Sequence, residues 1–290
     1  MLKSLRFFHT RLLAALVALV YLAGCSTCTV PGFNPTPTPH PTPSGLLSCS
    51  QGPSAITLGP ALAPFAVLAG STVTNVGNTL VTYAPGAVTG GIHDDLVGVS
   101  PGSAVTGFYP PGTVTDGPTA IYAATFNTNT AVPQAAQSAL TTAYNTAAGR
   151  TPATSVAGDL GGRTLTPGIY KSTSTLAIMS GNLTLDGGGN PQSVFIFQIG
   201  SSLTTTLNGS AGGNVILTNG ASACNIYWQV GSSATLGGQT FYGNVLAFSS
   251  ITINASTFTG RALAGGASLG NGAVTIPIAG GSLITNPGGQ

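Results

Sequence analysis

Glutamate is absent from this sequence, and charged residues of all kinds supply only 4% of its 290 positions. Helices on a protein surface usually carry long charged side chains, so a mostly helical soluble domain is excluded. Glycine is abundant, with 42 residues, and Thr, Ser and Asn fill most other polar positions. Strands and turns tolerate these small residues well. The composition therefore predicts an exported protein dominated by β-structure.

The scarcity of charge also limits the possible partners. Three of the seven basic residues, Lys3, Arg6 and Arg11, lie in an N-terminal segment that we expect to be removed. The remaining four basic residues stand against five aspartates, which gives a net charge of −1. A near-neutral protein has no basic patch for nucleic acid, so nucleic-acid binding is excluded. The mean hydropathy of +0.37 is too low for a bundle of membrane-spanning helices.

The N-terminus has the pattern of an export signal. Its basic residues precede an apolar run, Leu12 to Leu22, that is too short to span a bilayer comfortably. Leu22-Ala23-Gly24-Cys25 resembles the lipobox of bacterial lipoproteins. This resemblance implies that residues 1–24 are a lipoprotein signal peptide and that Cys25 carries a lipid, which anchors the exported protein at the cell envelope or surface. The alternative is an ordinary secretory signal with a chance cysteine.

Residues 25–54 are predicted to be a linker. Alternating prolines from Pro35 to Pro43 favour an extended polyproline II conformation, which cannot join a core. Cys28 and Cys49 flank this stretch and could form a disulfide in an oxidising compartment. Cys224 lies in an apolar stretch and is predicted to be a buried free thiol. No cysteines have the close spacing of a zinc site, so we expect neither a metal nor another cofactor.

Residues 55–290 are predicted to form one domain of short strands separated by Gly, Ser and Asn turns. The clearest strands are Phe65–Leu68, Leu183–Leu185, Val194–Ile199, Val215–Leu217, Ile226–Val230, Val245–Phe248 and Ile251–Ile253. The Ala-rich segment 131–149 differs, because Leu140, Ala143, Tyr144 and Ala147 recur at helical spacing and Gly149 follows as a C-cap would. We expect one helix there, laid along the β-structure.

The C-terminal third contains an internal repeat. The segment 240–247 (TFYGNVLA) matches 257–264 (TFTGRALA) at an offset of 17 residues, and 233–236 matches 250–253 at the same offset. Residues 273–276 repeat the second motif once more. Two strand motifs that recur together at one short period predict one coil of a parallel β-solenoid per period, with coils about 4.7–4.9 Å apart.

Alternation along these strands predicts which side chains point outward. Ile251 and Ile253 should point into the core, so Thr252 should point outward, in one column with Thr235 and Thr275. Five further threonines should also point outward, although alternation does not identify the face that they occupy. They are Thr240, Thr257, Thr259, Thr72 and Thr74. Threonine is common on strands in general, so the near absence of charge is what makes these columns a candidate binding surface.

Seven stretches occur along the chain in a characteristic order: 63–75, 95–102, 104–108, 157–162, 165–170, 194–200 and 223–231. In this order they resemble the bacterial, fungal and algal ice-binding (antifreeze) proteins over nearly all of residues 55–280. The resemblance implies a right-handed, three-faced, discontinuous β-solenoid with one long α-helix packed along one face. It also implies that the N-terminal strands insert beside the later coils. The loop Tyr83–His93 departs from the family's pattern.

The same resemblance implies that ice is the partner of a monomeric protein and adsorbs on a flat face carrying Thr, Ser and Ala. Binding of this kind would give thermal hysteresis, inhibition of ice recrystallisation, or adhesion of a cell to ice. Members of the family differ in the residues of this face, so no invariant site is carried over. Ice offers a neutral, periodic array of water molecules, and this agrees with the scarcity of charge.

Two other function classes remain open. A carbohydrate-active β-solenoid enzyme needs paired carboxylates, or a base with a cation. Only His93-Asp94-Asp95 offers such a group, and a solvated turn explains it equally well; Asp159 and Asp186 adjoin Gly-rich turns and are predicted to be turn formers. We therefore expect no enzyme activity and no catalytic residues. A structural or adhesive surface module would share the anchor and the solenoid and would differ only in its partner.

Overall fold

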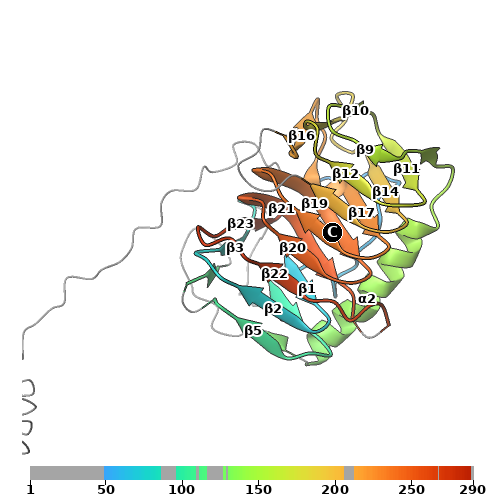
Figure 1. Ribbon diagram of the computed structural model, residues 1–290. Coiled ribbons are helices and arrows are strands. Elements are labelled where there is room, and N and C mark those ends of the chain that lie inside the picture. Colours follow the sequence, from blue (N-terminus) through green and yellow to red (C-terminus); the bar gives the residue numbers. More distant parts are fainter. Residues whose placement is uncertain are drawn as a thin grey trace, which may run out of the picture. The chain divides into compact units, whose positions relative to one another are not determined.

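The computed structural model describes residues 49–85, 96–108, 111–115, 127–128, 130–205, 212–266 and 268–288 (Figure 1). All of them belong to one compact unit, Pro43–Gln290. The signal peptide, the lipid site at Cys25, the Pro-rich stretch, Cys28 and the cluster at His93 lie outside the described residues. Within the described part, no helix is both long and apolar enough to cross a membrane.

The described strands form three sheets, and every strand pairing in them is parallel. The eight-stranded sheet has the order β5 (Ala104–Thr106), β2 (Thr72–Asn75), β22 (Val274–Ile276), β20 (Ile251–Ile253), β18 (Ala234–Leu236), β15 (Leu203–Thr205), β12 (Leu176–Ile178) and β9 (Gly158–Asp159). The three-stranded sheet comprises β10 (Thr164–Leu165), β13 (Leu183–Asp186) and β16 (Val215–Thr218).

The third sheet is the longest, with 12 strands. Its main path is β6 (Thr113–Val114), β3 (Leu80–Tyr83), β23 (Leu283–Asn286), β21 (Thr257–Ala264), β19 (Thr240–Ala247), β17 (Ile226–Val230), β14 (Phe195–Ile199), β11 (Gly168–Ser172) and β8 (Thr154–Ser155). Beside this path, β1 (Val67–Ala69) pairs with β21, β4 (Val97–Val99) with β1, and β7 (Asn127–Thr128) with β4. We call it the long sheet.

The long sheet contributes to two faces of the solenoid because β19 and β21 each turn a corner. Each contains a glycine with positive φ, Gly243 at 116° and Gly260 at 156°. In β21, the residues before the glycine pair with β23, whereas the residues after it pair with β1. Each coil thus passes from the eight-stranded sheet to a second face and then to a third. The chain is a three-faced parallel β-solenoid, as the sequence predicted.

The two ends of the chain interleave. The last C-terminal strands, β22 and β23, are flanked by N-terminal strands: β2 pairs with β22, and β3 pairs with β23. In the same way, β1 lies between β21 and β4. The predicted insertion of N-terminal strands beside the later coils is therefore confirmed.

The structure also confirms the register that the repeat predicts. Thr240–Ala247 lies against Thr257–Ala264 residue by residue, and Thr235 pairs with Thr252, which pairs with Thr275. Seen in Figure 1, the strands β12, β20, β22, β2 and β5 are stacked one below another.

The core is filled by aliphatic side chains from all three faces and by one column of aromatic rings. Phe197 and Trp228 stack with ring centroids 4.0 Å apart, and Tyr170, Phe241 and Phe258 continue the column on either side. The indole Nε1 of Trp228 donates to the carbonyl oxygen of Tyr242 at 2.9 Å. Such close packing makes the scaffold stiff.

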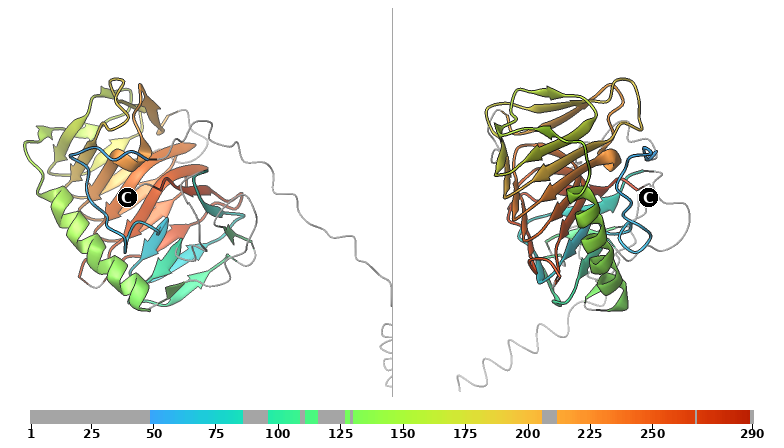
Figure 2. Two further views of the ribbon diagram at one scale, coloured as in Figure 1. Left: turned by 180° about the vertical axis from the view of Figure 1, so that it is seen from behind. Right: turned by 90° about the vertical axis from the view of Figure 1, so that its right-hand side faces the viewer.

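Helix α2 (Ala131–Ala148) runs alongside the stacked strands and is followed by Gly149, as predicted (Figure 1). Its buried face includes the four residues that the spacing selected, Leu140, Ala143, Tyr144 and Ala147. This face packs on the long sheet, and residues 49–65 lie over the same sheet beside it (Figure 2). Together they form a second core on the helix-covered face.

The structure corrects the prediction for the cysteines. Cys49 is bonded to Cys224, with Cα atoms 6.0 Å apart, so it is not paired with Cys28. Cys224 is buried as predicted, but it is not a free thiol. The reason is that residues 49–54, predicted to belong to the linker, fold back onto the domain beside the short helix η1 (Ala223–Asn225).

A fully buried cation joins the interleaved ends. Arg261 donates from Nε to the carbonyl oxygen of Ala63 (3.0 Å), from Nη1 to Oδ1 of Asn244 (3.0 Å), and from Nη2 to the carbonyl oxygen of Gly288 (3.3 Å). Burial lowers the pKa of Arg261 to about 10, although Tyr227 and Tyr83 act to raise it. The guanidinium is therefore still protonated at neutral pH.

Candidate functional site

A row of threonines runs along the outer surface of the eight-stranded sheet. In β20, for example, Ile251 and Ile253 are buried and Thr252 between them points outward. The register aligns the outward residue of one strand with that of the next, at the strand spacing of about 4.8 Å. We call this the threonine row; its members, in spatial order, are Thr204, Thr235, Thr252, Thr275, Thr74 and Thr106.

A second row of small side chains lies beside the first. It comes from the residue just before the first inward-pointing residue of each strand. Backbone hydrogen bonds such as Ala234 N to Ser250 O place these residues on adjacent coils. The flanking row consists of Ser202, Ser233, Ser250, Ala273, Thr72 and Ala104, all at least partly exposed. The two rows make a surface of hydroxyls and methyl groups over a stiff core.

The hydroxyls of the threonine row are available to solvent. Within the described residues, none of the six makes a hydrogen bond to another protein group. Beyond Thr204 the row continues to Ala177 and then to Asp159. Among the described positions of this row, Asp159 is the one charged side chain. The uncharged surface therefore has a defined end at the edge strand β9.

The carboxylate of Asp159 accepts hydrogen bonds both within its own turn, from Gly161, as the sequence predicted for a turn former, and from Met179 and Ser180, which follow the neighbouring strand β12. Desolvation acts to raise its pKa, but hydrogen bonds from the backbone N–H groups of Gly161, Met179 and Ser180 outweigh it and lower the pKa to about 2. Because the pKa is depressed in the folded state, the stabilisation is present above pH 3.8, the ordinary value for the unfolded chain, and is lost as the pH falls towards 2.

We accordingly expect Asp159→Asn to lower the free energy of unfolding at pH 7 by about 1 kcal/mol, a figure that allows for solvent screening at this edge position. The difference between the variant and the wild type should shrink between pH 4 and pH 2, because the carboxyl of the unfolded chain becomes protonated below pH 3.8 whereas the folded protein keeps it ionised down to about pH 2. Urea unfolding at a series of pH values measures this difference. A difference in the free energy of unfolding that stays constant down to pH 2 would contradict this stabilising role of the Asp159 carboxylate.

The two groups of predicted threonines separate in the structure. Thr235, Thr252 and Thr275 lie together in the threonine row, and Thr74 joins them. Thr72 belongs to the flanking row. By contrast, Thr240, Thr257 and Thr259 lie on the second face, in the first halves of β19 and β21.

Thr259 is not an outward, accessible residue, and its prediction as such is wrong. It aligns with Thr285, which aligns with Thr82, so the second face also carries a row of threonines. However, Thr259 is 0% exposed and Thr285 only 2% exposed. Strand alternation is the same on both faces, and only the packing above them distinguishes the buried row from the exposed one.

Burial leaves the hydroxyl of Thr259 without a hydrogen-bond partner in the described part of the chain. An unsatisfied buried hydroxyl costs about 1–3 kcal/mol, and valine has nearly the same shape. We expect Thr259→Val to raise the free energy of unfolding by about 1 kcal/mol, measured by urea denaturation. Thr257→Val, which alters a partly exposed hydroxyl two residues away, serves as the control and should change little. A destabilised Thr259→Val variant would show that the hydroxyl has a partner.

Sequence reasoning missed part of the exposed surface. Thr204, Thr106 and the serines of the flanking row were not selected, although Leu203-Thr204-Thr205 has the same inward–outward pattern as the selected strands. The coil between β15 and β18 is longer than the repeat, because it also holds β16 and η1, so the fixed offset does not reach Thr204.

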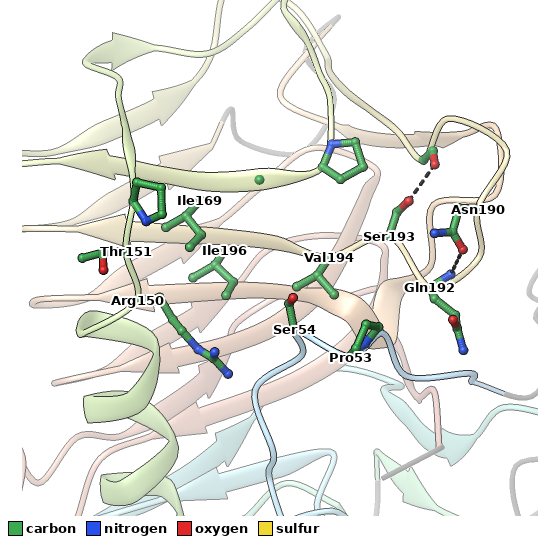
Figure 3. A pocket seen from close by; sticks show the side chains of 14 residues that line it. Pro53, Ser54, Arg150, Thr151, Ile169, Asn190, Gln192, Ser193, Val194 and Ile196 are labelled. Carbon is green, nitrogen blue, oxygen red and sulfur yellow. Dashed lines mark hydrogen bonds between the residues drawn. The ribbon is translucent and has the colours of Figure 1, made fainter.

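A groove of about 650 Å³ lies on a different part of the domain, next to the C-terminal end of helix α2 (Figure 3). Its floor is apolar, with Ile169, Val194 and Ile196, and Arg150 stands at one end. None of the residues that line it carries a carboxylate or an imidazole. The groove thus gives no support to the carbohydrate-enzyme alternative.

The surface geometry agrees with comparisons to known proteins. A family model described as "Ice-binding-like" matches residues 67–276. This range includes all six members of the threonine row and all eight strands of the eight-stranded sheet. The chain belongs to the ice-binding-like family.

Members of this family from several organisms are similar to the chain. An ice-binding protein of Nostoc sp. (strain HG1) is 45% identical over 216 residues, which are 73% of this chain and 68% of the Nostoc protein. Ice-binding protein 1 of Shewanella frigidimarina is 45% identical over 108 residues, 37% of this chain but only 12% of that longer protein. The chain therefore spans a small part of some of its relatives.

Among solved structures, the crystal structure of an ice-binding protein from an Antarctic biological consortium has a TM-score of 0.65 to this chain at 42% sequence identity. The match covers 81% of this chain and 93% of that protein. The ice-binding-like fold is therefore shared over most of both molecules.

Proposed function

We propose that the chain binds ice through the threonine row and the flanking row of the eight-stranded sheet. The observation that carries this proposal is the unbroken register of six outward threonines, from Thr204 to Thr106. The described positions of this row include one charged residue, Asp159, which lies at the β9 end. Family membership supports the same partner.

The physics of the surface suits ice. Ice has no charge to attract a protein, so recognition depends on shape and on many weak contacts held in register. The methyl groups of the threonines exclude water, whereas their free hydroxyls hold it. Because the rows rest on a stiff core, little additional ordering is required when the surface meets the crystal, and the entropic cost of binding is small.

Ice binding is tested by partitioning into a growing ice hemisphere. The purified domain should enter the ice, while a bystander protein of similar size should remain in the liquid. A nanolitre ice-growth assay would then report thermal hysteresis and crystal shape. We expect thermal hysteresis to be present and the crystals to be faceted. A domain that stays in the liquid would overturn the proposal and favour a surface module with another partner.

We further propose that the protein works as an exported, monomeric lipoprotein held at the cell surface through Cys25. The lipobox-like residues Leu22-Ala23-Gly24-Cys25 support this. Mass spectrometry of the mature N-terminus is expected to find a diacylglyceryl cysteine at Cys25. An unmodified N-terminus downstream of Cys25 would show instead that the protein is secreted free.

A further inference from the structure

The N-terminal end of the domain is fastened in an unusual way. Residues 49–65 make no strand pairing; the chain joins a sheet only at β1. Their hydrogen bonds are scattered. Asn225 accepts from the N–H of Gly52 (3.2 Å) and donates to the carbonyl oxygen of Ser50 (2.9 Å), and Arg150 donates to the carbonyl oxygen of Ala55 (3.2 Å). Contacts that lie one after another along a segment break singly when the segment is pulled from its end.

The disulfide bypasses this segment, which is held by buried side chains and scattered hydrogen bonds but not by strand pairing. It joins Cys49 to Cys224, across a sequence separation of 175 residues. Cys224 lies in η1, directly before β17, and β17 is an interior strand of the long sheet that pairs with β14 on one side and β19 on the other. A load that enters at Cys49 therefore passes straight into the middle of the solenoid.

The path from this point to the proposed ice surface is short. The strand that follows β17 is β18, whose outward residue is Thr235, next to Thr252 in the threonine row. The disulfide lies beside the helix-covered face, away from the eight-stranded sheet, so a tether attached there leaves the threonine row uncovered.

We propose that the Cys49–Cys224 disulfide gives this protein a further function, the transmission of tension between its N-terminal tether and ice. The proposal rests on the proposed function, since it requires a protein held at its N-terminus and bound to ice by the threonine row. The disulfide keeps residues 50–223 out of the load path. Tension then acts on the paired strands around β17, which share the load, rather than on residues 49–65, which would detach one contact at a time.

Single-molecule force spectroscopy tests the load path without ice. The full mature chain would be held at its two termini, and wild type would be compared with the double variant Cys49→Ser/Cys224→Ser. In wild type, no unfolding step should precede the main rupture. The double variant should show an early step of about 60 Å at lower force as residues 49–65 peel away, and its final extension should be longer by about 600 Å. Equal first-rupture forces and no early step in the variant would overturn the proposal.

Reduction of the wild-type molecule while it is held under low force repeats the test on a chain that folded with its disulfide. The same early step should appear after the reductant is added, and its absence would also overturn the proposal. Thermal hysteresis of the double variant in free solution should equal that of wild type, because the threonine row is untouched. If hysteresis is absent in both proteins, the proposed function fails while the load path stands, so the two failures are distinguishable.

Discussion

Replacement of Thr252 with tyrosine should abolish thermal hysteresis while leaving the fold intact. Thr252 lies between Thr235 and Thr275 in the middle of the threonine row, and its side chain points away from the core. A phenol ring at this position would stand above the plane of the row and hold the ice lattice away from its neighbours. Because binding is the sum of weak contacts in register, one raised side chain removes many of them at once.

A matched control is available on another face. Thr257 is also a partly exposed strand threonine, but it lies on the second face, beside Thr240. Thr257→Tyr should therefore retain the hysteresis of wild type. Tyrosine is favourable in strands, so both variants should unfold within about 0.5 kcal/mol of wild type, as followed by circular dichroism. Unchanged hysteresis in Thr252→Tyr, or equal losses in both variants, would remove the threonine row from the ice-binding site.

Much of the fold could be predicted because the solenoid repeats its register in the sequence. The two copies of the motif at Thr240 and Thr257 are aligned residue by residue in the structure, and the outward position of Thr252 follows from the buried isoleucines on either side of it. Local patterning is sufficient here, since each coil contacts chiefly its two neighbours.

The features that were mispredicted depend on contacts between distant parts of the chain. Thr259 has the same alternation as Thr252, yet Thr259 is buried and Thr252 is partly exposed, because the second face is covered at Thr259 whereas the eight-stranded sheet is open to solvent at Thr252. The partner of Cys49 lies 175 residues away and is reached only because the N-terminal segment folds back over the long sheet. Local pattern carries no information about either contact.

Replacement of Gly260 with alanine should have the largest effect on stability. Gly260 lies at the corner of β21, directly against Gly243 at the corner of β19, and its φ of 156° is one that side chains disfavour. A Cβ at Gly260 would meet the backbone carbonyl oxygen of Gly243, well inside contact distance, and a backbone atom in the middle of a sheet cannot move aside. Overpacking and backbone strain together should lower the free energy of unfolding by roughly 3 kcal/mol.

Gly280→Ala is the matched control for this prediction. Gly280 is exposed, and a Cβ there has nothing within 4 Å, so the same added methyl group should change stability by less than about 0.5 kcal/mol. In a domain of this size, the loss expected for Gly260→Ala corresponds to a fall in Tm of roughly 6–12 °C. Thermal unfolding followed by circular dichroism measures both variants. Similar melting temperatures for the two would mean that the corner can relax, and that the stacked glycines are not what holds β19 and β21 at their close approach.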